Sequence, residues 1–295
     1  MATMPLRSRN MSNFISYRRS ITNHVVTGVA IVSTILVLVP LVAIFGNLLY
    51  KGASSLNLAF FTKVPVPGGE TGGGMANAIV GSAVILGLAS LLGIPMGIGA
   101  GVYLAEYARG TWFGAAVRFT ADVLNGVPSI VMGLAAYALI VARQQHFSGM
   151  AGSVALAIMM IPTVTRTTEE MLATVPKSVR EAALGLGIPK WRTVISVSLR
   201  TASPGIITGC MLAFARVAGE TAPLLFTAFG NQFWSFDLNQ PIAALPLQIY
   251  VYALSPYDEW HRLAWAGALV LIVMIMASVT LVRIFANRGA LKGGN

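Results

Sequence analysis

The chain has 295 residues, of which 56% are hydrophobic and only 10% are charged. Soluble domains carry roughly 25% charged residues, so this composition leaves too little polar surface to face water. It argues against a soluble enzyme, a disordered tail and a secreted disulfide scaffold. Cys210 is the only cysteine and has no histidine cluster near it in the sequence, so it predicts neither a disulfide within the chain nor a zinc site.

Six stretches are apolar and long enough to cross a bilayer, for which a helix needs about 20 residues. Five of them hold charge-free runs, and the sixth is interrupted only by Arg216 and Glu220. The sequence therefore predicts an all-α membrane protein with six transmembrane helices, at residues 25–50, 75–105, 119–142, 147–165, 205–230 and 263–282. The first stretch lies too deep in the chain and is too long for a cleavable signal peptide, which predicts a permanent anchor.

Lysine and arginine fall mainly on one side of these predicted spans, which accounts for the net charge of +10 without nucleic-acid binding. Because cytoplasmic loops are enriched in Lys and Arg, we expect both termini in the cytoplasm of a bacterial inner-membrane protein. The expected parts are a cytoplasmic segment 1–24, a transmembrane domain 25–284 with a cytoplasmic loop 166–204 and periplasmic loops 51–74 and 231–261, and a cytoplasmic tail 285–295.

No nucleotide-binding signature accompanies the spans. The glycine run at 68–74 lacks the Lys-Ser/Thr pair and the preceding strand of a phosphate-binding loop, so it predicts a flexible connection. No Walker A pattern occurs anywhere in the sequence. If transport through this chain consumes ATP, another subunit must hydrolyse it.

The loop 166–204 is the most informative segment outside the spans. Ser178 with Glu181 three residues later fits a capping box, and Gly187 followed by Pro189 fits a helix stop, which predicts a short helix at 179–187. Glu181 then has a local role as a helix cap. Alternatively, the helix presents the small residues Ala182 and Ala183 to a groove on a cytoplasmic partner, and the two interpretations are compatible.

Glu181-Ala182-Ala183 followed by Gly187 resembles the EAA loop of ABC-importer permeases. In that family the loop carries a coupling helix that seats on the ATP-binding subunit. The resemblance implies a type I ABC importer permease fold, a non-catalytic subunit without a cofactor, and coupling roles for these four residues. The family's downstream Ile-x-Leu-Pro is matched only in part, by Val197-Ser198-Leu199-Arg200.

A narrower resemblance runs from about residue 56 to the end of the last span. It is similar to the PstA-type permeases of phosphate-specific ABC transporters in Gly72–Ile79, Tyr103–Tyr107, Arg166–Glu169, Arg216–Leu224 and Asn231–Trp234. That family implies a homologous second permease (PstC-like), a dimer of ATP-binding subunits (PstB-like) and a periplasmic phosphate-binding protein (PstS-like). It implies an ATP-driven phosphate importer in which this chain forms half of the pore.

Arg216 and Glu220 carry a separate physical argument. A charge at the bilayer centre costs about 2.5–3.5 kcal/mol on insertion scales, so it is normally paired or faces a polar cavity. Four residues apart on a helix, the two side chains either neutralise each other or line a substrate path. Arginine suits an oxyanion through bidentate hydrogen bonds, Glu220 would accept a hydrogen bond from the P–OH group that phosphate keeps and sulfate lacks, and Thr221 would add a donor.

Arg166 lies where the fourth span meets the cytoplasm. It is either a positive-inside anchor or a residue of the inner mouth of the path, and the family resemblance supports the second interpretation. The rival functions are an ABC permease for another oxyanion such as molybdate or sulfate and, less favoured, an ion-coupled carrier that works alone. The sequence shows no set of residues for a membrane enzyme, and charges inside a span argue against a pure scaffold.

Overall fold

The structure is a computed structural model that describes residues 6–292, and side chains from residue 19 to residue 284. Residues 1–5 of the expected cytoplasmic segment and residues 293–295 of the expected tail lie outside the described part. The chain divides into two units, residues 1–51 and 52–295. Helix α1 (Leu6–Ser55) makes up the described part of the first unit. Residues 19–47 are all exposed although most are apolar, as expected of a helix surrounded by lipid or by other chains.

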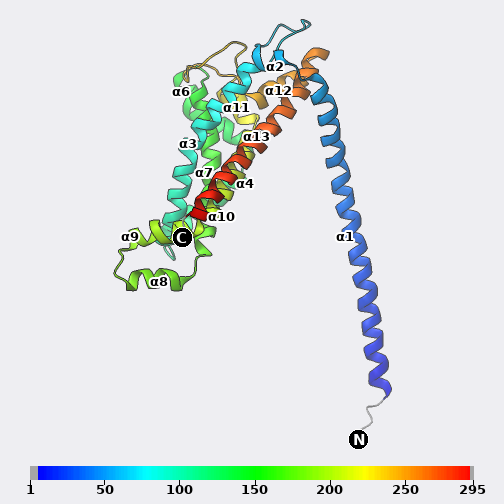
Figure 1. Ribbon diagram of the computed structural model, residues 1–295, viewed down its shortest axis with the longest axis vertical. Helices are drawn as coiled ribbons and strands as arrows, with labels where there is room; N and C mark the ends of the chain where they lie inside the picture. The colour runs from blue at the N-terminus through cyan, green and yellow to red at the C-terminus, as the bar shows by residue number, and fades with distance from the viewer. Residues whose placement is uncertain (1–5, 293–295) are drawn as a thin grey trace. The chain divides into compact units, whose positions relative to one another are not determined.

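The second unit is mainly helical in its described part, with long loops at 63–75 and 228–244 (Figure 1). Its elements are α2 (Leu58–Thr62), α3 (Ala76–Glu106), α4 (Trp112–Gly126), α5 (Ser129–Ala136), the π-helix η1 (Tyr137–Val141), α6 (Ala142–Gln144), α7 (Gly149–Ala173), α8 (Lys177–Gly185), α9 (Lys190–Thr193), the π-helix η2 (Val194–Ser198), α10 (Leu199–Ala218), α11 (Ala222–Thr227), α12 (Leu245–Ala253) and α13 (Asp258–Lys292). Residues 6–292 form no strand, only an isolated bridge between Phe229 and Ile242. The predicted all-α fold is confirmed.

Helices α3 and α7 form the central seam of the second unit. Gly93, Gly97 and Gly101 line one side of α3, where an added Cβ would lie 3.1 Å from the Ala157 carbonyl at Gly93 and 2.6 Å from the Thr165 carbonyl at Gly101. The absent side chains therefore let the two backbones approach closely, as small residues do in membrane bundles. Because the contacting residue numbers rise together along both helices, α3 and α7 run parallel.

The parallel arrangement fixes the role of the segment between them. For α7 to start at the same end as α3, residues 107–148 must cross back, and α4 followed by α5–α6 does so with a bend of 108°. The bend lies at Val127-Pro128, where the residue before a proline disfavours helix. The span expected at 119–142 is thus a broken crossing, and with the five long apolar helices it makes six.

The span expected at 205–230 also differs from the structure. Residues 190–218 form one run of helix through α9, η2 and α10, and the run ends at Ala218. The chain then breaks at Gly219 and Glu220 before the short helix α11. The hydropathy of the sequence continued through this break because its flanking residues are apolar, so composition alone did not reveal it.

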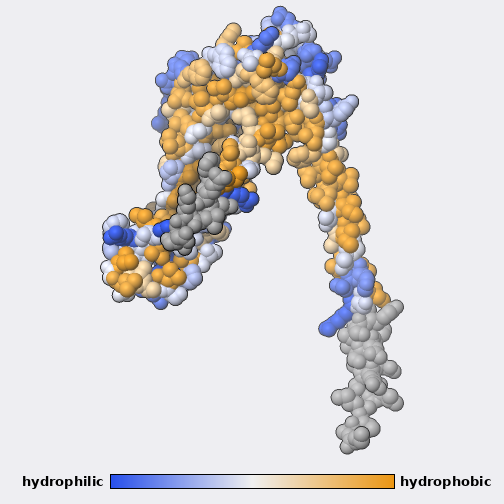
Figure 2. All heavy atoms as spheres, viewed as in Figure 1, coloured by the Kyte–Doolittle hydropathy of each residue, from blue (hydrophilic) through white to orange (hydrophobic). Residues whose placement is uncertain are grey.

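The bundle of the second unit has two distinct ends, which Figure 1 shows at α12 and at α8. At the α12 end, Phe60, Met75, Leu245 and Tyr252 belong to one buried cluster. At the α8 end, another buried cluster contains Leu172, Val175, Ile206 and Cys210. Figure 2 shows hydrophobic residues over the middle of the bundle and hydrophilic residues gathered toward its ends, the pattern of a membrane-embedded domain.

Candidate functional site

Arg216 lies in the last turn of α10 and is exposed. Its guanidinium makes no ion pair or hydrogen bond with any residue in the described part of the chain. Thr208 and Leu212 share its exposed helix face, at four-residue spacing. The free carbonyls at a helix C-terminus favour a cation there, so α10 supports the charge while leaving its hydrogen-bond donors available.

Glu220 does not pair with Arg216. The i,i+4 geometry expected for these two residues requires a continuous helix, but α10 ends at Ala218 and the Glu220 backbone NH only closes a turn onto the Val217 carbonyl at 3.1 Å. The Glu220 side chain is half-buried and has no ion-pair partner among the described residues. The self-neutralising pair considered from the sequence is therefore absent, because the helix breaks between its members.

Thr221 caps the start of α11 with its backbone rather than with its side chain. Its hydroxyl donates a long hydrogen bond, 3.5 Å, to the carbonyl of Pro246. This contact ties the break after α10 to the first turn of α12 and leaves the hydroxyl only weakly engaged.

The packing of α7 against α10 places Arg166 relative to Arg216. An added Cβ at Gly205 would touch Met171, and one at Gly209 would touch Thr167, so the helices run antiparallel with residue numbers that sum to a constant. Arg216 therefore lies level with Met160 on α7. Arg166 is six residues further along α7, or roughly 9 Å closer to the α8 end at 1.5 Å per residue.

Unlike Arg216, Arg166 is held by two carboxylates. Its Nε lies 2.8 Å from Asp122 Oδ1 on α4, and its Nη1 lies 2.8 Å from Glu169 Oε2 one turn along α7. Arg118 on α4 binds the other oxygen of Glu169 at 2.5 Å and donates to the Leu104 carbonyl at 3.0 Å. The four charged groups therefore join α4, α7 and the end of α3.

Sequence reasoning found Arg166 but missed its partners. Arg118 lies between the spans expected at 75–105 and 119–142, where the sequence gives it no role beyond its positive charge, and Asp122 lies within the second of these spans. The available signal was the appearance of opposite charges, Asp122 and Glu169, near the cytoplasmic ends of two predicted neighbouring spans.

Helix α8 contains the residues that resemble the EAA loop, and it starts earlier than expected. Its N-cap is Pro176 and its first residue is Lys177, so Ser178 is inside the helix and no capping box forms. Glu181 and Ala182 are exposed, whereas Ala183 is buried within the chain itself. Only the first two of these three residues are therefore available to a partner surface.

Gly187 ends the helix in the left-handed region, with φ of +78°. The backbone NH groups of Leu186 and Gly187 donate to the carbonyls of Ala182 and Leu184, and the NH of Ile188 donates to Ala183. Glycine adopts this conformation without the strain that a Cβ introduces, so its place after the helix has a backbone reason.

Arg180 fastens α8 to the bundle. Its guanidinium lies 2.9 Å from Glu106 at the end of α3, and the two side chains are only 12% and 8% exposed. It also donates to the Leu172 and Val175 carbonyls at 2.5 and 3.0 Å, and weakly to Ser198 Oγ in η2 at 3.4 Å. One largely covered side chain thus connects α8 to α3, α7 and η2, a role that sequence reasoning did not assign.

The surface around α8 is apolar where it is not paired. Exposed hydrophobic side chains gather on α8 and the residue that follows it, on α9 and on η2, namely Val179, Leu184, Leu186, Trp191 and Ile195. At this end of the bundle Figure 2 shows hydrophobic and hydrophilic residues side by side. Large apolar residues exposed together beside charged ones mark a protein interaction site.

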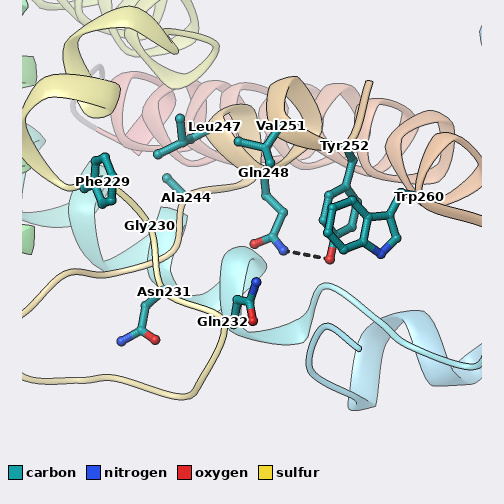
Figure 3. Close-up of a pocket in the computed structure, with 10 residues that line it drawn as sticks. All are labelled: Phe229, Gly230, Asn231, Gln232, Ala244, Leu247, Gln248, Val251, Tyr252 and Trp260. Carbon is teal, nitrogen blue, oxygen red and sulfur yellow. Dashed lines mark hydrogen bonds between the residues drawn. The ribbon is translucent and has the colours of Figure 1, made fainter. Parts of the chain in front are cut away.

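A pocket of about 250 Å³ opens at the α12 end (Figure 3). Its lining carries no charged side chain. Trp260 stacks on Tyr252 at 4.5 Å, and Gln248 donates to the Tyr252 hydroxyl at 3.0 Å. Burial raises the pKa of the Tyr252 phenol, which keeps it neutral. This pocket therefore offers no cationic side chain to an oxyanion, in contrast to the regions around Arg216 and Arg166.

Known proteins resemble the chain over most of its length. Residues 93–289 match the family described as binding-protein-dependent transport system inner membrane component. The phosphate transport system permease protein PstA of Yersinia pestis is 51% identical over 81% of this chain and 81% of its own length. The protein of the same name from Haemophilus influenzae is 44% identical over 92% of this chain and 96% of its own length.

Solved structures share the fold at low sequence identity. An inward-facing conformation of the MetNI methionine ABC transporter matches with a TM-score of 0.57 at 16% identity, covering 75% of this chain and 96% of the matched chain. An amino acid ABC transporter with histidines matches with a TM-score of 0.53 at 19% identity, covering 72% and 92%. These likenesses support the type I permease architecture.

Proposed function

The chain belongs to the family of binding-protein-dependent transport system inner membrane components, and on that basis we propose that it is the permease subunit of an ATP-driven importer of inorganic phosphate. It is a multi-pass protein of the inner membrane. The chemistry of its exposed arginine and the names of its relatives agree on an oxyanion as cargo.

The orientation follows from the distribution of charge. The α8 end carries most of the arginines and lysines of the connecting loops, so the positive-inside rule puts it in the cytoplasm and the α12 end in the periplasm. Six crossings then leave both termini in the cytoplasm. The expected segments 1–24, 25–284 and 285–295 are proposed on the same ground.

The proposed partners are a second, homologous permease, two ATP-binding subunits and a periplasmic phosphate-binding protein. The exposed apolar surface around α8 supports an ATP-binding subunit on the cytoplasmic side, with Glu181 and Ala182 at the contact. Gly187 terminates that helix with a left-handed backbone, and Ala183 is buried within this chain. ATP binding would move α8, and the buried Arg180 contacts would carry this movement into α3 and α7.

The single observation that carries the proposal is the exposed and unpaired Arg216 where α10 breaks inside the membrane region. An unpaired guanidinium there is costly unless it faces the pore or its cargo. Bidentate hydrogen bonds to phosphate provide that stabilisation. Arg166, roughly 9 Å deeper, would receive the anion next at the inner mouth.

Glu220 and Thr221 would refine what Arg216 binds. Phosphate at neutral pH keeps at least one P–OH group, which can donate to the Glu220 carboxylate, whereas sulfate would meet only repulsion. The Thr221 hydroxyl, which is only weakly engaged with Pro246, would give a further hydrogen bond. The negative charge of Glu220 also keeps the anion from binding too tightly to leave.

Uptake by the reconstituted complex tests the proposal. Proteoliposomes holding both permeases and the ATP-binding subunits, supplied with the binding protein, should take up phosphate only with ATP. Excess sulfate or molybdate should compete poorly. Preferred uptake of either anion would identify a different oxyanion importer, and phosphate uptake by this chain without any ATPase would identify an ion-coupled carrier.

A further inference from the structure

The two carboxylates that hold Arg166 differ in how firmly they are built in. The Glu169 side chain is 13% exposed, and its two oxygens are divided between Arg118 and Arg166. The Asp122 side chain is 54% exposed and has Arg166 as its only ion-pair partner among the described residues. Breaking the Glu169 contacts would leave a buried charge uncompensated, whereas Asp122 can return to water at little cost.

Asp122 also occupies the part of Arg166 that an incoming anion would use. Arg166 gives Nη1 to Glu169 and Nε to Asp122, so Glu169 fixes the guanidinium in place while Asp122 covers its Nε edge. Carboxylate and phosphate oxygens compete for the same guanidinium donors because both match its planar geometry. A phosphate ion reaching this level would therefore meet an arginine that is oriented but already engaged.

We propose that Asp122 is an internal competitor for the transported oxyanion at Arg166. Its carboxylate pairs with Arg166 when no anion is bound and moves away from the guanidinium when phosphate binds there. It then returns to Arg166 and displaces the phosphate. Asp122 thereby lowers the affinity of Arg166 for phosphate and speeds the release of phosphate to the cytoplasm. This inference rests on the proposed function, since it takes the cargo to be an oxyanion that passes Arg166.

Asp122→Asn tests the inference because it keeps the shape of the side chain and removes its charge. The assay is equilibrium binding of radiolabelled phosphate to the nucleotide-free complex of permeases and ATP-binding subunits in nanodiscs, without the binding protein. We expect the variant to hold phosphate at least tenfold more tightly than the unaltered complex. Its turnover in uptake should fall several-fold because release becomes slower.

Two further variants make the result specific. Arg166→Ala combined with Asp122→Asn should abolish the gain in binding, because the guanidinium that binds phosphate is removed. Glu259→Gln breaks a matched exposed ion pair, Glu259 with Arg262 at 3.1 Å, at the opposite end of the bundle and should leave binding unchanged. Asp122→Ser provides a second substitution if the asparagine variant assembles poorly.

The inference is overturned if complexes that assemble with Asp122→Asn or Asp122→Ser bind phosphate no more tightly than the unaltered complex. If uptake of phosphate still needs Arg216 and ATP in that case, the proposed function stands and only the role of Asp122 fails. If the unaltered complex carries sulfate instead of phosphate, the proposed function fails. Tighter sulfate binding by Asp122→Asn would then still support displacement at Arg166.

Discussion

Arg180 on α8 and Arg216 on α10 use the same guanidinium group in opposite ways. Arg180 is only 12% exposed and is satisfied by one carboxylate, two carbonyls and a hydroxyl from α3, α7, the α7–α8 connection and η2. Arg216 is exposed, lies at the end of α10 and has no ion-pair partner in the part of the chain that the structure describes. The first arrangement uses the arginine to join helices, and the second leaves its donors for a group outside the chain.

Arg166 combines features of both. Glu169 anchors it as Glu106 anchors Arg180, but its Nε contacts an exposed carboxylate that a ligand could replace. Burial of the partner, and not the presence of an ion pair, therefore separates a structural arginine from one available to bind cargo.

The largest expected effect comes from breaking the ion pair between Arg180 and Glu106. Arg180→Ala leaves Glu106 without a partner in a site where its side chain is 8% exposed, which costs about 3–5 kcal/mol of folding free energy in comparable buried pairs. We expect a clearly lower thermal midpoint for the detergent-solubilised complex, and ATP hydrolysis that no longer drives uptake.

A matched double variant checks that the loss comes from the stranded charge. Arg180→Met together with Glu106→Leu replaces the pair by apolar side chains, which is often neutral for stability. Thermal stability should recover only in part in the double variant, because the Leu172 and Val175 carbonyls still lose their Arg180 donors. If the Arg180→Ala complex is as stable as the unaltered complex and still couples ATP hydrolysis to uptake, the Arg180–Glu106 pair does not transmit movement from α8.

Arg216→Ala should produce the opposite profile, a functional loss with little change in stability. Removing a charged hydrogen-bonding partner costs about 1.5–3 kcal/mol of binding, so uptake should fall roughly tenfold to a hundredfold. Because Arg216 makes no ion pair among the described residues, the thermal midpoint should hardly move. Phosphate uptake in proteoliposomes and assembly with the ATP-binding subunits are the two measurements.

Arg216→Lys separates charge from geometry in the same assay. Lysine keeps the positive charge but cannot form the bidentate contact, so uptake should be intermediate. Normal uptake by Arg216→Ala in an intact complex would remove this residue from the path.

At α8 a pair of glycines allows a smaller and cleaner test. Gly185 and Gly187 both have open space around them, but only Gly187 has a left-handed backbone, with φ of +78°. Gly187→Ala should weaken the end of the helix by about 1–2 kcal/mol, whereas Gly185→Ala should strengthen it by about 0.5–1 kcal/mol. Hydrogen exchange of the Leu186 and Ile188 amides reports the difference, and equal exchange in the two variants would contradict it.

The length of the uncharged apolar runs predicted most of the transmembrane helices, because hydropathy depends only on the types of residue in each run. The sequence did not predict where helices break. Pro128 gave a local signal for the bend between α4 and α5, and Gly219 followed by Pro223 gave one for the end of α10, but the hydropathy of the run around Ala218 concealed the second signal. A break stabilised by packing against α12, as through Thr221 and Pro246, depends on residues distant in sequence.

The candidate site was predicted in its residues more than in its contacts. Arg216 and Arg166 stood out because charge within or beside a span is costly, a property of single residues. Their partners depend on helix pairing, which brings Asp122 to Arg166 from another helix and separates Glu220 from Arg216 within a turn. Pairwise geometry of this kind arises from tertiary packing and has no counterpart in local spacing.

Glu220→Gln gives the smallest expected effect and tests selectivity at the unpaired site. Glutamine can still accept a hydrogen bond from the P–OH group, so phosphate uptake should stay within about threefold of the unaltered complex. It can also donate to sulfate and no longer repels it, so sulfate should inhibit uptake several-fold more strongly. Glu70→Gln, which removes an exposed carboxylate from the loop before α3, is the charge-matched control and should change neither quantity. If sulfate inhibition is the same in both variants, Glu220 does not discriminate between the anions, and rejection of sulfate must come from another part of the complex.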